Sequence, residues 1–538
     1  MPNNLDQGRP IGATPENGFV RALGLFDGTM MVVGSMIGAG IFIVAADISR
    51  LTGSAGGLLL TWILTGLLTV AAALSYGELA ALFPYAGGQY AYLREAYSPL
   101  WGFLYGWALF LVIQTGTIAA VGIGFARYLG VLIPTVSPDI WLIRPIPISI
   151  HYAISLSVQQ FVAILMIAFL TLLNARGIRL GKLIQNAFST VKMLILLGII
   201  IVGIIMGKTS GALAYNFSHP WAIREARLIG PTVNFLSRLV PSVSVATGAF
   251  GVFVAFAAAQ TGSLFSADCW NNIGFTAAEV KNPRRDVALS MTFGTIIVTI
   301  LFCLANFGYL CVLRLPQIQS APDDRVATAA MAAIFGRAGA AIMAVGIVIC
   351  TFGCDNGLIL SGARVYYAMA RDRLFFRSLG TLNKKGVPAS ALLLQSVWIT
   401  VLILVRSRHL HSGGVVTYGN LYSDLLEYVV FTVLMFYVLT VAGIFRLRRS
   451  RPDAERPYRA LGYPVVPLLY IAAAVAIMSV LLLYKTQTSW PGLAVVLLGV
   501  PVYVFWRRNR VAIIPEVRLA TEQHGDQNMS RRLPADRG

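Results

Sequence analysis

The glycine-rich run from Gly34 to Phe42, written GSMIGAGIF, is the feature that most constrains this chain. It interrupts the first long apolar segment, where a plain membrane span would have uninterrupted Leu, Ile and Val. Each glycine weakens a helix by about 1 kcal/mol relative to alanine. Inside a bilayer, backbone that leaves the helix is tolerated only where it is buried in protein or lines a cavity. The run therefore indicates either a tightly packed helix or a helix that breaks to bind a ligand.

The composition indicates an integral membrane protein. Hydrophobic residues make up 57% of the 538 residues, charged residues only 12%, and the mean hydropathy is +0.72. Soluble domains carry about 25% charged residues and seldom repeat apolar runs of spanning length. The polar N-terminal residues lack the apolar core of a signal peptide, so we expect the first span to insert without cleavage.

Apolar segments of spanning length recur along the chain and predict an all-α protein with twelve transmembrane helices. The segments are 25–49, 56–83, 99–130, 154–174, 185–207, 244–281, 286–313, 338–376, 389–405, 419–445, 463–484 and 489–506. We group them into a first half (25–207), an outward loop (208–243), a second half (244–445), a basic loop (446–462) and two peripheral helices (463–506). A cytoplasmic N-terminal segment (1–24) and a cytoplasmic tail (507–538) flank them.

The net charge of +19 fits a membrane topology better than a nucleic-acid surface. With alternating spans, most of the 42 Lys and Arg residues fall on one side, which the positive-inside rule assigns to the cytoplasm. Both termini are therefore expected in the cytoplasm, with attraction to anionic lipid as a side effect. The five cysteines lie in or at the ends of spans without metal-ligand spacing, so we expect no disulfide framework, metal or cofactor.

Lys192 stands at membrane depth in the fifth span, where an unpaired lysine costs several kcal/mol by most estimates, about 2.5–3.5 on insertion scales. One interpretation is that its side chain extends to the interface. The favoured interpretation places its ammonium against backbone carbonyls of a broken helix, where it replaces a bound cation.

The sixth span is the second candidate for a broken helix. It is too long for one straight span and too polar in the middle to face lipid. Its polar and small residues are Gly262, Ser263, Asp268, Asn271, Asn272 and Gly274. The alternative is a kinked helix with interhelical hydrogen bonds.

The eighth span carries Asp355 and Asn356 near its middle. Asp355 is a candidate partner for Lys192 or for another internal group. Interhelical packing through Asn356 and Gly357 is an equally good explanation of these polar residues.

The two interrupted segments each open one half of the chain, which favours a leucine-transporter-type 5+5 inverted repeat with helices one and six broken. A half-helix that begins near Ala39 presents free N–H groups and a partial positive charge, which suit a carboxylate. Carbonyl groups exposed at Met36 and Phe265 accept an ammonium group. The pair of breaks therefore predicts a zwitterionic ligand, of which an amino acid is the simplest.

Five features in chain order resemble the amino acid–polyamine–organocation superfamily, and most closely its L-type amino acid transporter branch and bacterial relatives. They are VGSMIGAGIF, YGELAALFPYAGGQYAYLREAYSPLWGFLYGW, the lysine of span five, GSLFSADCWNNIGFTAAEVKNPRRD and NGLILSGARVYYAMARD. The resemblance covers about residues 25–505. It implies an amino acid permease that works by alternating access.

The resemblance also implies a set of site residues. The amides of Ala39 and Gly40 would bind the substrate carboxylate, with Gly38 letting the backbone approach it. The carbonyls of Met36, Phe265 and Asp268 would take the amino group, and the Phe265 ring would close the site as a gate. Lys192 would take the place of a sodium ion and link span one to span eight. Supporting residues are Gly34, Ser35, Cys354, Asp355 and Asn356.

This sequence departs from the family pattern at four positions. Ala39 replaces a serine, and Cys354 and Leu358 replace small hydroxyl residues near the lysine. Asp268 stands where relatives have glycine or aspartate; we expect it to cap the second half-helix, with selection of a cationic side chain as the alternative. The outward loop between spans three and four has no cysteine, which predicts a stand-alone transporter of the inner (cytoplasmic) membrane without a disulfide-linked heavy chain.

Other function classes fit the sequence less well. A channel has rings of polar or charged residues along a pore, and an enzyme has convergent catalytic groups; the sequence indicates neither. A polyamine or other organic-cation transporter of the same fold and a non-transporting nutrient sensor remain alternatives. Within amino acid transport, exchange with Lys192 permanently charged and proton symport with Lys192 titrating are both open.

Overall fold

The computed structural model describes residues 19, 21–149, 152–223, 248–410, 416–418 and 421–511. Among these residues, ten helices are long and apolar enough to cross a membrane. Two further apolar helices, Leu25–Met36 and Ala389–Leu404, are shorter. The predicted segments 1–24, 208–243 and 507–538 lie wholly or largely outside the described residues.

The first apolar segment is an interrupted helix. α1 (Leu25–Met36) ends inside the glycine run, and α2 (Gly40–Ile43) and α3 (Ala45–Thr52) continue after it. We call residues 37–39 the first break. The helix breaks here because Ile37 adopts extended backbone with a ψ of 90°, which ends the i to i−4 hydrogen-bond pattern. α3 then stops at Gly53, whose φ of 64° favours glycine.

The rest of the first half consists of long helices. α4 (Ala55–Leu82) is capped at its N-terminus by Ser54, whose hydroxyl accepts a hydrogen bond from the Gly57 amide. The third span is α6 (Pro99–Ala108), a π-helical turn η1 (Leu109–Ile113) and α7 (Gln114–Leu132), and α5 (Gln89–Ala96) precedes it. α8 (Val158–Ala175), α9 (Ile178–Gly207) and the short α10 (Ala212–Phe217) follow.

The sixth apolar segment is also interrupted. α12 (Gly248–Ser266) ends before a stretch in which Cys269 has a φ of 70°, and α13 (Asn272–Phe275) and η2 (Ala277–Glu279) follow. We call residues 267–271 the second break. Both interruptions thus fall where the sequence predicts them.

The remaining helices complete the bundle. They are α14 (Pro283–Val312), α15 (Leu315–Gln319), η3 (Pro322–Asp324), α16 (Val326–Arg371), η4 (Arg377–Gly380), α17 (Ala389–Leu404), α18 (Leu421–Ser450), α19 (Val465–Tyr484) and α20 (Thr486–Val511). α16 starts well before the predicted boundary of 338, because an alanine-rich helix precedes the span and joins it across a bend at Gly336.

The expectation of a purely helical chain is wrong at one end of the bundle. β1 (Trp141–Pro147), β2 (Tyr152–Ser157), β3 (Val405–Leu410) and β4 (Val416–Tyr418) form an antiparallel sheet in the order β1-β2-β3-β4, with Ala153 opposite Arg406. The prolines in WLIRPIP argue against a strand, but β1 lies at the sheet edge, where proline is tolerated.

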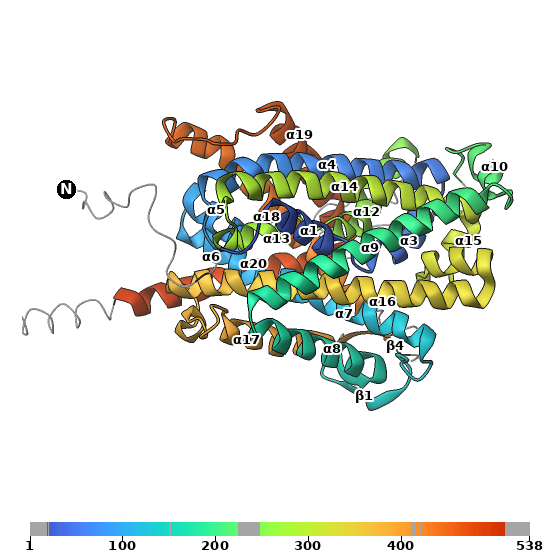
Figure 1. Ribbon diagram of the computed structural model, residues 1–538, viewed down its shortest axis with the longest axis horizontal. Helices are drawn as coiled ribbons and strands as arrows, with labels where there is room; N and C mark the ends of the chain where they lie inside the picture. The colour runs from blue at the N-terminus through green and yellow to red at the C-terminus, as the bar shows by residue number, and fades with distance from the viewer. Residues whose placement is uncertain are drawn as a thin grey trace, which may run out of the picture.

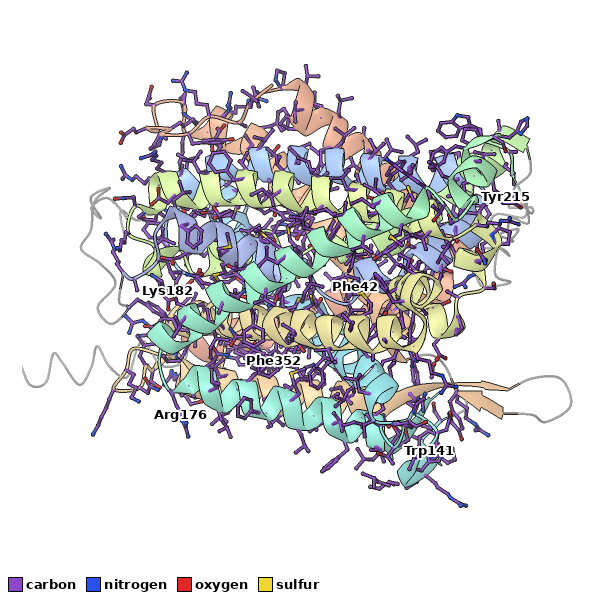
Figure 2. The ribbon with its side chains drawn as sticks, turned by 45° about the vertical axis from the view of Figure 1, so that its right-hand side comes forward. Phe42, Trp141, Arg176, Lys182, Tyr215 and Phe352 are labelled. Atoms are coloured by element: carbon purple, nitrogen blue, oxygen red, sulfur yellow. The ribbon has the colours of Figure 1, made fainter. Side chains whose placement is uncertain are left out.

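The interrupted helices lie inside the bundle. In Figure 1, α9 crosses the face between α14 and α16, over α1, and it contacts all three helices. α1 also contacts α13, and α2 contacts α12, so the two interrupted helices pack against each other. Figure 2 places Arg176 and Lys182 at one end of the molecule and Trp141 and Tyr215 at the other.

Candidate functional site

At the first break, two backbone amides are hydrogen-bonded and the next two are free. The Ile37 amide donates to the Val33 carbonyl, and the Gly38 amide donates to the Met36 carbonyl, both at 3.0 Å. Within the described residues, the amides of Ala39 and Gly40 have no hydrogen-bond acceptor. These free donors begin the second half of the interrupted helix, as the sequence predicts.

Lys192 contacts the backbone carbonyls at the first break. Its side chain is fully buried, and its Nζ donates to the carbonyl oxygens of Gly34 at 2.5 Å and Ile37 at 3.2 Å. The predicted contact with the carbonyls of a broken helix is therefore present, and its role in transport stays a prediction. Cys354 from α16 donates its thiol to the Ser35 carbonyl at 3.1 Å, so a cysteine makes the link from span eight to the break.

The glycines of the run are also required by close packing. A Cβ atom on Gly40 would lie 2.1 Å from Ser266 Oγ, and one on Gly34 would lie 2.1 Å from Ser189 Oγ. One on Gly38 would lie 3.2 Å from Cys354 Sγ. The space beside these three Cα atoms is therefore filled by protein. Tight packing and helix interruption, which the sequence poses as alternatives, both hold.

Asp268 does not cap the second half-helix, so that expectation is wrong. Its carboxylate accepts a hydrogen bond from the hydroxyl of Tyr437 on α18. The N-cap position of α13 is Asn271, whose side chain makes no capping bond. The reach across to α18 explains the difference, because the chain turns at Cys269 before α13 begins. The Phe265 carbonyl, an expected ligand for the ammonium group, accepts the Asp268 amide at 3.3 Å.

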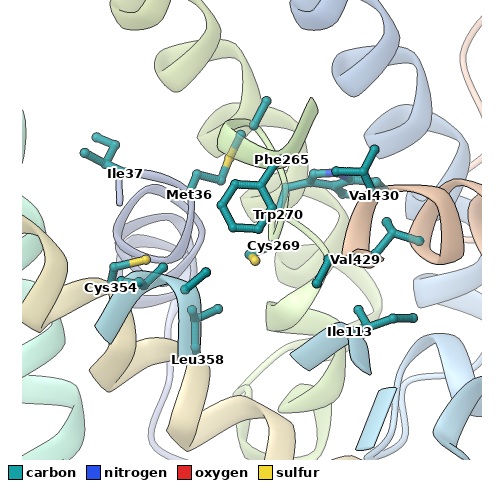
Figure 3. Close-up of a cluster of buried hydrophobic side chains, with 14 of the residues drawn as sticks. Met36, Ile37, Ile113, Phe265, Cys269, Trp270, Cys354, Leu358, Val429 and Val430 are labelled. Atoms are coloured by element: carbon teal, nitrogen blue, oxygen red, sulfur yellow. The ribbon is translucent and has the colours of Figure 1, made fainter. Parts of the chain in front are cut away.

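Two cavities adjoin the second break. Both are small. The first is lined by Gln89, Tyr105, Leu109, Ile113, Gln114, Thr117, Asp268, Cys269, Asn271, Asn272, Phe275, Val433 and Tyr437. The second is lined by Thr69, Ala72, Leu264, Phe265, Ala267, Asp268, Trp270, Val430, Val433, Leu434, Tyr437 and Tyr470. Asp268 lines both. Met36, Gly38, Ala39 and Gly40 line neither, although Figure 3 draws Met36, Phe265 and Trp270 in one buried cluster.

The polar lining of the first cavity contains residues that the sequence analysis missed. Gln89 accepts from the Asn271 side chain at 3.0 Å and donates to Thr440 at 3.0 Å. Gln114 donates to the Leu358 carbonyl at 2.8 Å. Gln114 was detectable as a single amide side chain in the third apolar segment, whereas Gln89 lies outside any predicted span.

Asn356 and Asp355 differ in their surroundings. The Asn356 side chain accepts from Asn174 and donates to Gln185, at 3.0 and 3.1 Å, and so joins α16 to α8 and α9. Asp355 is fully buried, and neither of its carboxyl oxygens has a hydrogen-bond partner in the described part of the chain. No ion pair with Lys192 forms among those residues, so of the two alternatives the packing through Asn356 is correct.

Ion pairs hold the helices together at the end that carries Lys182. Lys182 pairs with Asp27 at 2.7 Å, and Arg448 pairs with the buried Glu78 at 2.6 Å. Glu279, after the second break, pairs with Arg364 of α16 at 3.0 Å, and both are buried. These ion pairs therefore connect α1 to α9, α4 to α18 and η2 to α16.

A family model described as amino acid permease matches residues 23–505, nearly the whole described bundle. The chain belongs to the amino acid permease family. This permease is accordingly a multi-pass membrane transporter and not an enzyme. The match confirms the resemblance to the amino acid–polyamine–organocation superfamily.

Individual relatives of the permease are similar over most of their length. The serine/threonine exchanger SteT of Bacillus subtilis (strain 168) is 26% identical over 93% of this chain and 100% of the relative. The human large neutral amino acids transporter small subunit 2 is 28% identical over 96% of this chain and 89% of the relative. The human b(0,+)-type amino acid transporter 1 is 26% identical over 88% of this chain and 83% of the relative. These relatives support amino acid transport.

Proposed function

We propose that this permease moves amino acids by alternating access, with the substrate held between the two breaks. The amides of Ala39 and Gly40 take the carboxylate, and the carbonyls of Met36, Phe265 and Asp268 take the amino group. The observation that carries this proposal is the pair of unbonded amides at the start of α2, a helix that packs against α12, whose residue Phe265 lines the second cavity. A helix N-terminus attracts an anion, and each carbonyl oxygen keeps a second lone pair for an ammonium group.

The proposed architecture is twelve spans in a 5+5 inverted repeat, with α19 and α20 peripheral. Its support is the equivalent placement of the two interruptions and the extensive contact of α4 with α14, the second element of each half. α1 with α2 and α3, and the 16-residue α17, are the two short spans that complete the twelve. An inner-membrane location with both termini in the cytoplasm follows from the basic loops.

Lys192 acts in this proposal as a fixed cation that keeps the first break open. Two backbone carbonyls, of Gly34 and Ile37, surround its ammonium as they would surround a metal ion. The segment 133–157 between α7 and α8 contains no cysteine, which supports a transporter that works without a heavy chain disulfide-linked at that loop.

Uptake into proteoliposomes tests the proposal. Purified protein is reconstituted and offered a panel of labelled amino acids, with and without internal amino acid and with and without a pH gradient. Protein-free liposomes are the control. Uptake that needs internal substrate indicates exchange, and uptake that needs the gradient indicates symport. Failure to move or bind any amino acid would overturn the proposal.

A cationic substrate is the second candidate, favoured by one observation. Asp268 lines both cavities, and among the described residues no Lys or Arg side chain pairs with it. A carboxylate without a basic partner attracts an amine or guanidinium group. Competition of the same uptake by arginine, lysine and a polyamine, compared with serine and leucine, separates this candidate from neutral amino acid transport.

A further inference from the structure

Asp355 is the one carboxyl group in the described residues whose two oxygen atoms are both fully buried and both lack a hydrogen-bond partner. It lies near the middle of the expected eighth span, and its side chain is fully buried. Its Oδ2 points toward α7, because a Cβ atom placed on Gly122 would lie 3.5 Å from that oxygen. Ile167 of α8 fills the same space, at 2.9 Å from that Cβ position. The carboxyl group therefore faces an apolar contact between three helices.

An ionised carboxylate is poorly stabilised in such surroundings. Charge removed from water needs an opposite charge or several hydrogen-bond donors, and a protonated carboxyl group needs far less. The nearest cation is Lys192 of α9, whose ammonium is already held by the carbonyls of Gly34 and Ile37. The other titratable groups near Asp355 are the thiols of Cys354 and Cys269, which carry no positive charge.

We infer that Asp355 is a proton-binding site, and that its proton is a coupling ion of the transport cycle. In the arrangement seen here the carboxyl group is protonated and neutral. When α16 exposes it to water, the O–H bond breaks, the proton passes to water and the electron pair stays on the carboxylate. This coupling role rests on the proposed transport function, whereas the binding of the proton does not.

The surroundings of Asp355 supply a route from its charge to the first break. A carboxylate at this position attracts the Lys192 ammonium away from the carbonyls of Gly34 and Ile37. The preceding residue, Cys354, donates to the Ser35 carbonyl, so a shift of α16 acts on the same backbone. Protonation of Asp355 therefore favours the break as seen here, and deprotonation favours a different arrangement.

Infrared spectroscopy tests proton binding without any substrate. Wild-type protein in lipid is expected to give a protonated-carboxyl C=O band that shifts in D₂O and is absent in Asp355→Asn. Asp286→Asn removes a buried aspartate from the first turn of α14, and this control is expected to keep the band. Equal bands in the wild type and Asp355→Asn would overturn the inference. Asp355→Glu keeps a carboxyl group and is expected to keep a protonated-carboxyl band, so it allows a test of the same position if Asp355→Asn fails to fold.

Proton flux tests the coupling role. An acid-sensitive dye inside proteoliposomes is expected to report proton movement when substrate enters through the wild type and the Asp286→Asn control. The flux per substrate should fall at least tenfold in Asp355→Asn and persist in Asp355→Glu. Substrate transport by the wild type with no proton movement would overturn the coupling role and leave the proposed function standing. Absence of any transport would overturn the proposed function, while the infrared band still decides proton binding.

Discussion

The two breaks differ in how their polar groups are satisfied. In the first break, the carbonyls of Gly34 and Ile37 bind the Lys192 ammonium, and the Ser35 carbonyl binds the Cys354 thiol. In the second break, Asp268 lines two cavities, and its carboxylate accepts a hydrogen bond from Tyr437 of α18. Protein groups thus bind the carbonyls of the first break, whereas the second break has a carboxyl group that lines two small cavities.

This difference suggests different roles for the two breaks: the first in binding the substrate backbone and the second in distinguishing substrate side chains. A site that binds the backbone of every amino acid needs fixed donors, and in the proposed function these donors are the amides of Ala39 and Gly40 at the first break. A site that distinguishes side chains needs polar groups beside unfilled space, and Asp268 lines both of the small cavities. We expect substitutions at the first break to abolish transport and substitutions at the second to change its selectivity.

Lys192→Ala is expected to have the largest effect. It leaves two buried carbonyls without a donor, each costing about 1–3 kcal/mol, so the first break rearranges. Transport into proteoliposomes should fall at least about tenfold, since 1.4 kcal/mol corresponds to a factor of ten. The protein should still purify as a monodisperse species, because the bundle packing is otherwise intact. Wild-type transport rates in this variant would contradict the role assigned to Lys192.

Gly40→Ala should have the next largest effect, through steric conflict between the two interrupted helices. The new Cβ would lie 2.1 Å from Ser266 Oγ and 3.2 Å from the Ser266 Cα. Overpacking of this kind costs about 1–3 kcal/mol. Thermal stability in detergent and transport should both fall, and Ser266→Gly should partly restore them in the double variant.

Gly198→Ala is the matched control for this prediction. Gly198 also lies in a membrane helix, α9, and a Cβ atom there would meet nothing within 4 Å. It should leave stability and transport unchanged or slightly improve them, because alanine favours the helix. Equal losses in Gly40→Ala and Gly198→Ala would show that the effect of Gly40→Ala does not come from its close contact with Ser266.

Phe265→Ala and Phe275→Ala compare the two cavities. Phe265 lines the second cavity, and Phe275 lines the first. If Phe265 closes the substrate site, its truncation should raise the KM for amino acid uptake several-fold more than truncation of Phe275. Both side chains are buried, so thermal stability is measured alongside to separate packing loss from gating. Equal changes in KM would contradict a gate at Phe265.

The features that could be predicted from the sequence depend on a strong local pattern or on one residue whose burial in the membrane costs much free energy. Lys192 cannot lie in lipid unpaired, so its contact with the broken helix followed from its position. The glycine run and the polar stretch of span six predicted both interruptions for the same reason. The sheet was missed because prolines usually oppose strands, and only the pairing of β2 with β3, far apart in the chain, makes an edge position available to β1.

The parts of the site that depend on long-range neighbours were not predictable. Asp268 looked like a local helix cap, and its real partner, Tyr437, comes from α18. Tyr437 itself was one of several tyrosines in apolar segments, with nothing local to distinguish it. The isolation of Asp355 likewise depends on which residues of α7 and α8 reach it, because local sequence does not determine the partners of a buried polar group.

Tyr437→Phe is expected to have the smallest effect and tests the second break most selectively. It removes the hydroxyl that donates to Asp268 and keeps the ring, which packs against Trp270 and Tyr76. A hydrogen bond of this kind contributes about 1 kcal/mol, or about fivefold in KM. Because this variant removes the hydrogen bond from α18 to Asp268 and leaves the first break untouched, the relative preference among amino acids should change with little change in maximal rate. An equal loss of rate for all substrates would indicate that Tyr437 has a structural role and does not determine substrate selectivity.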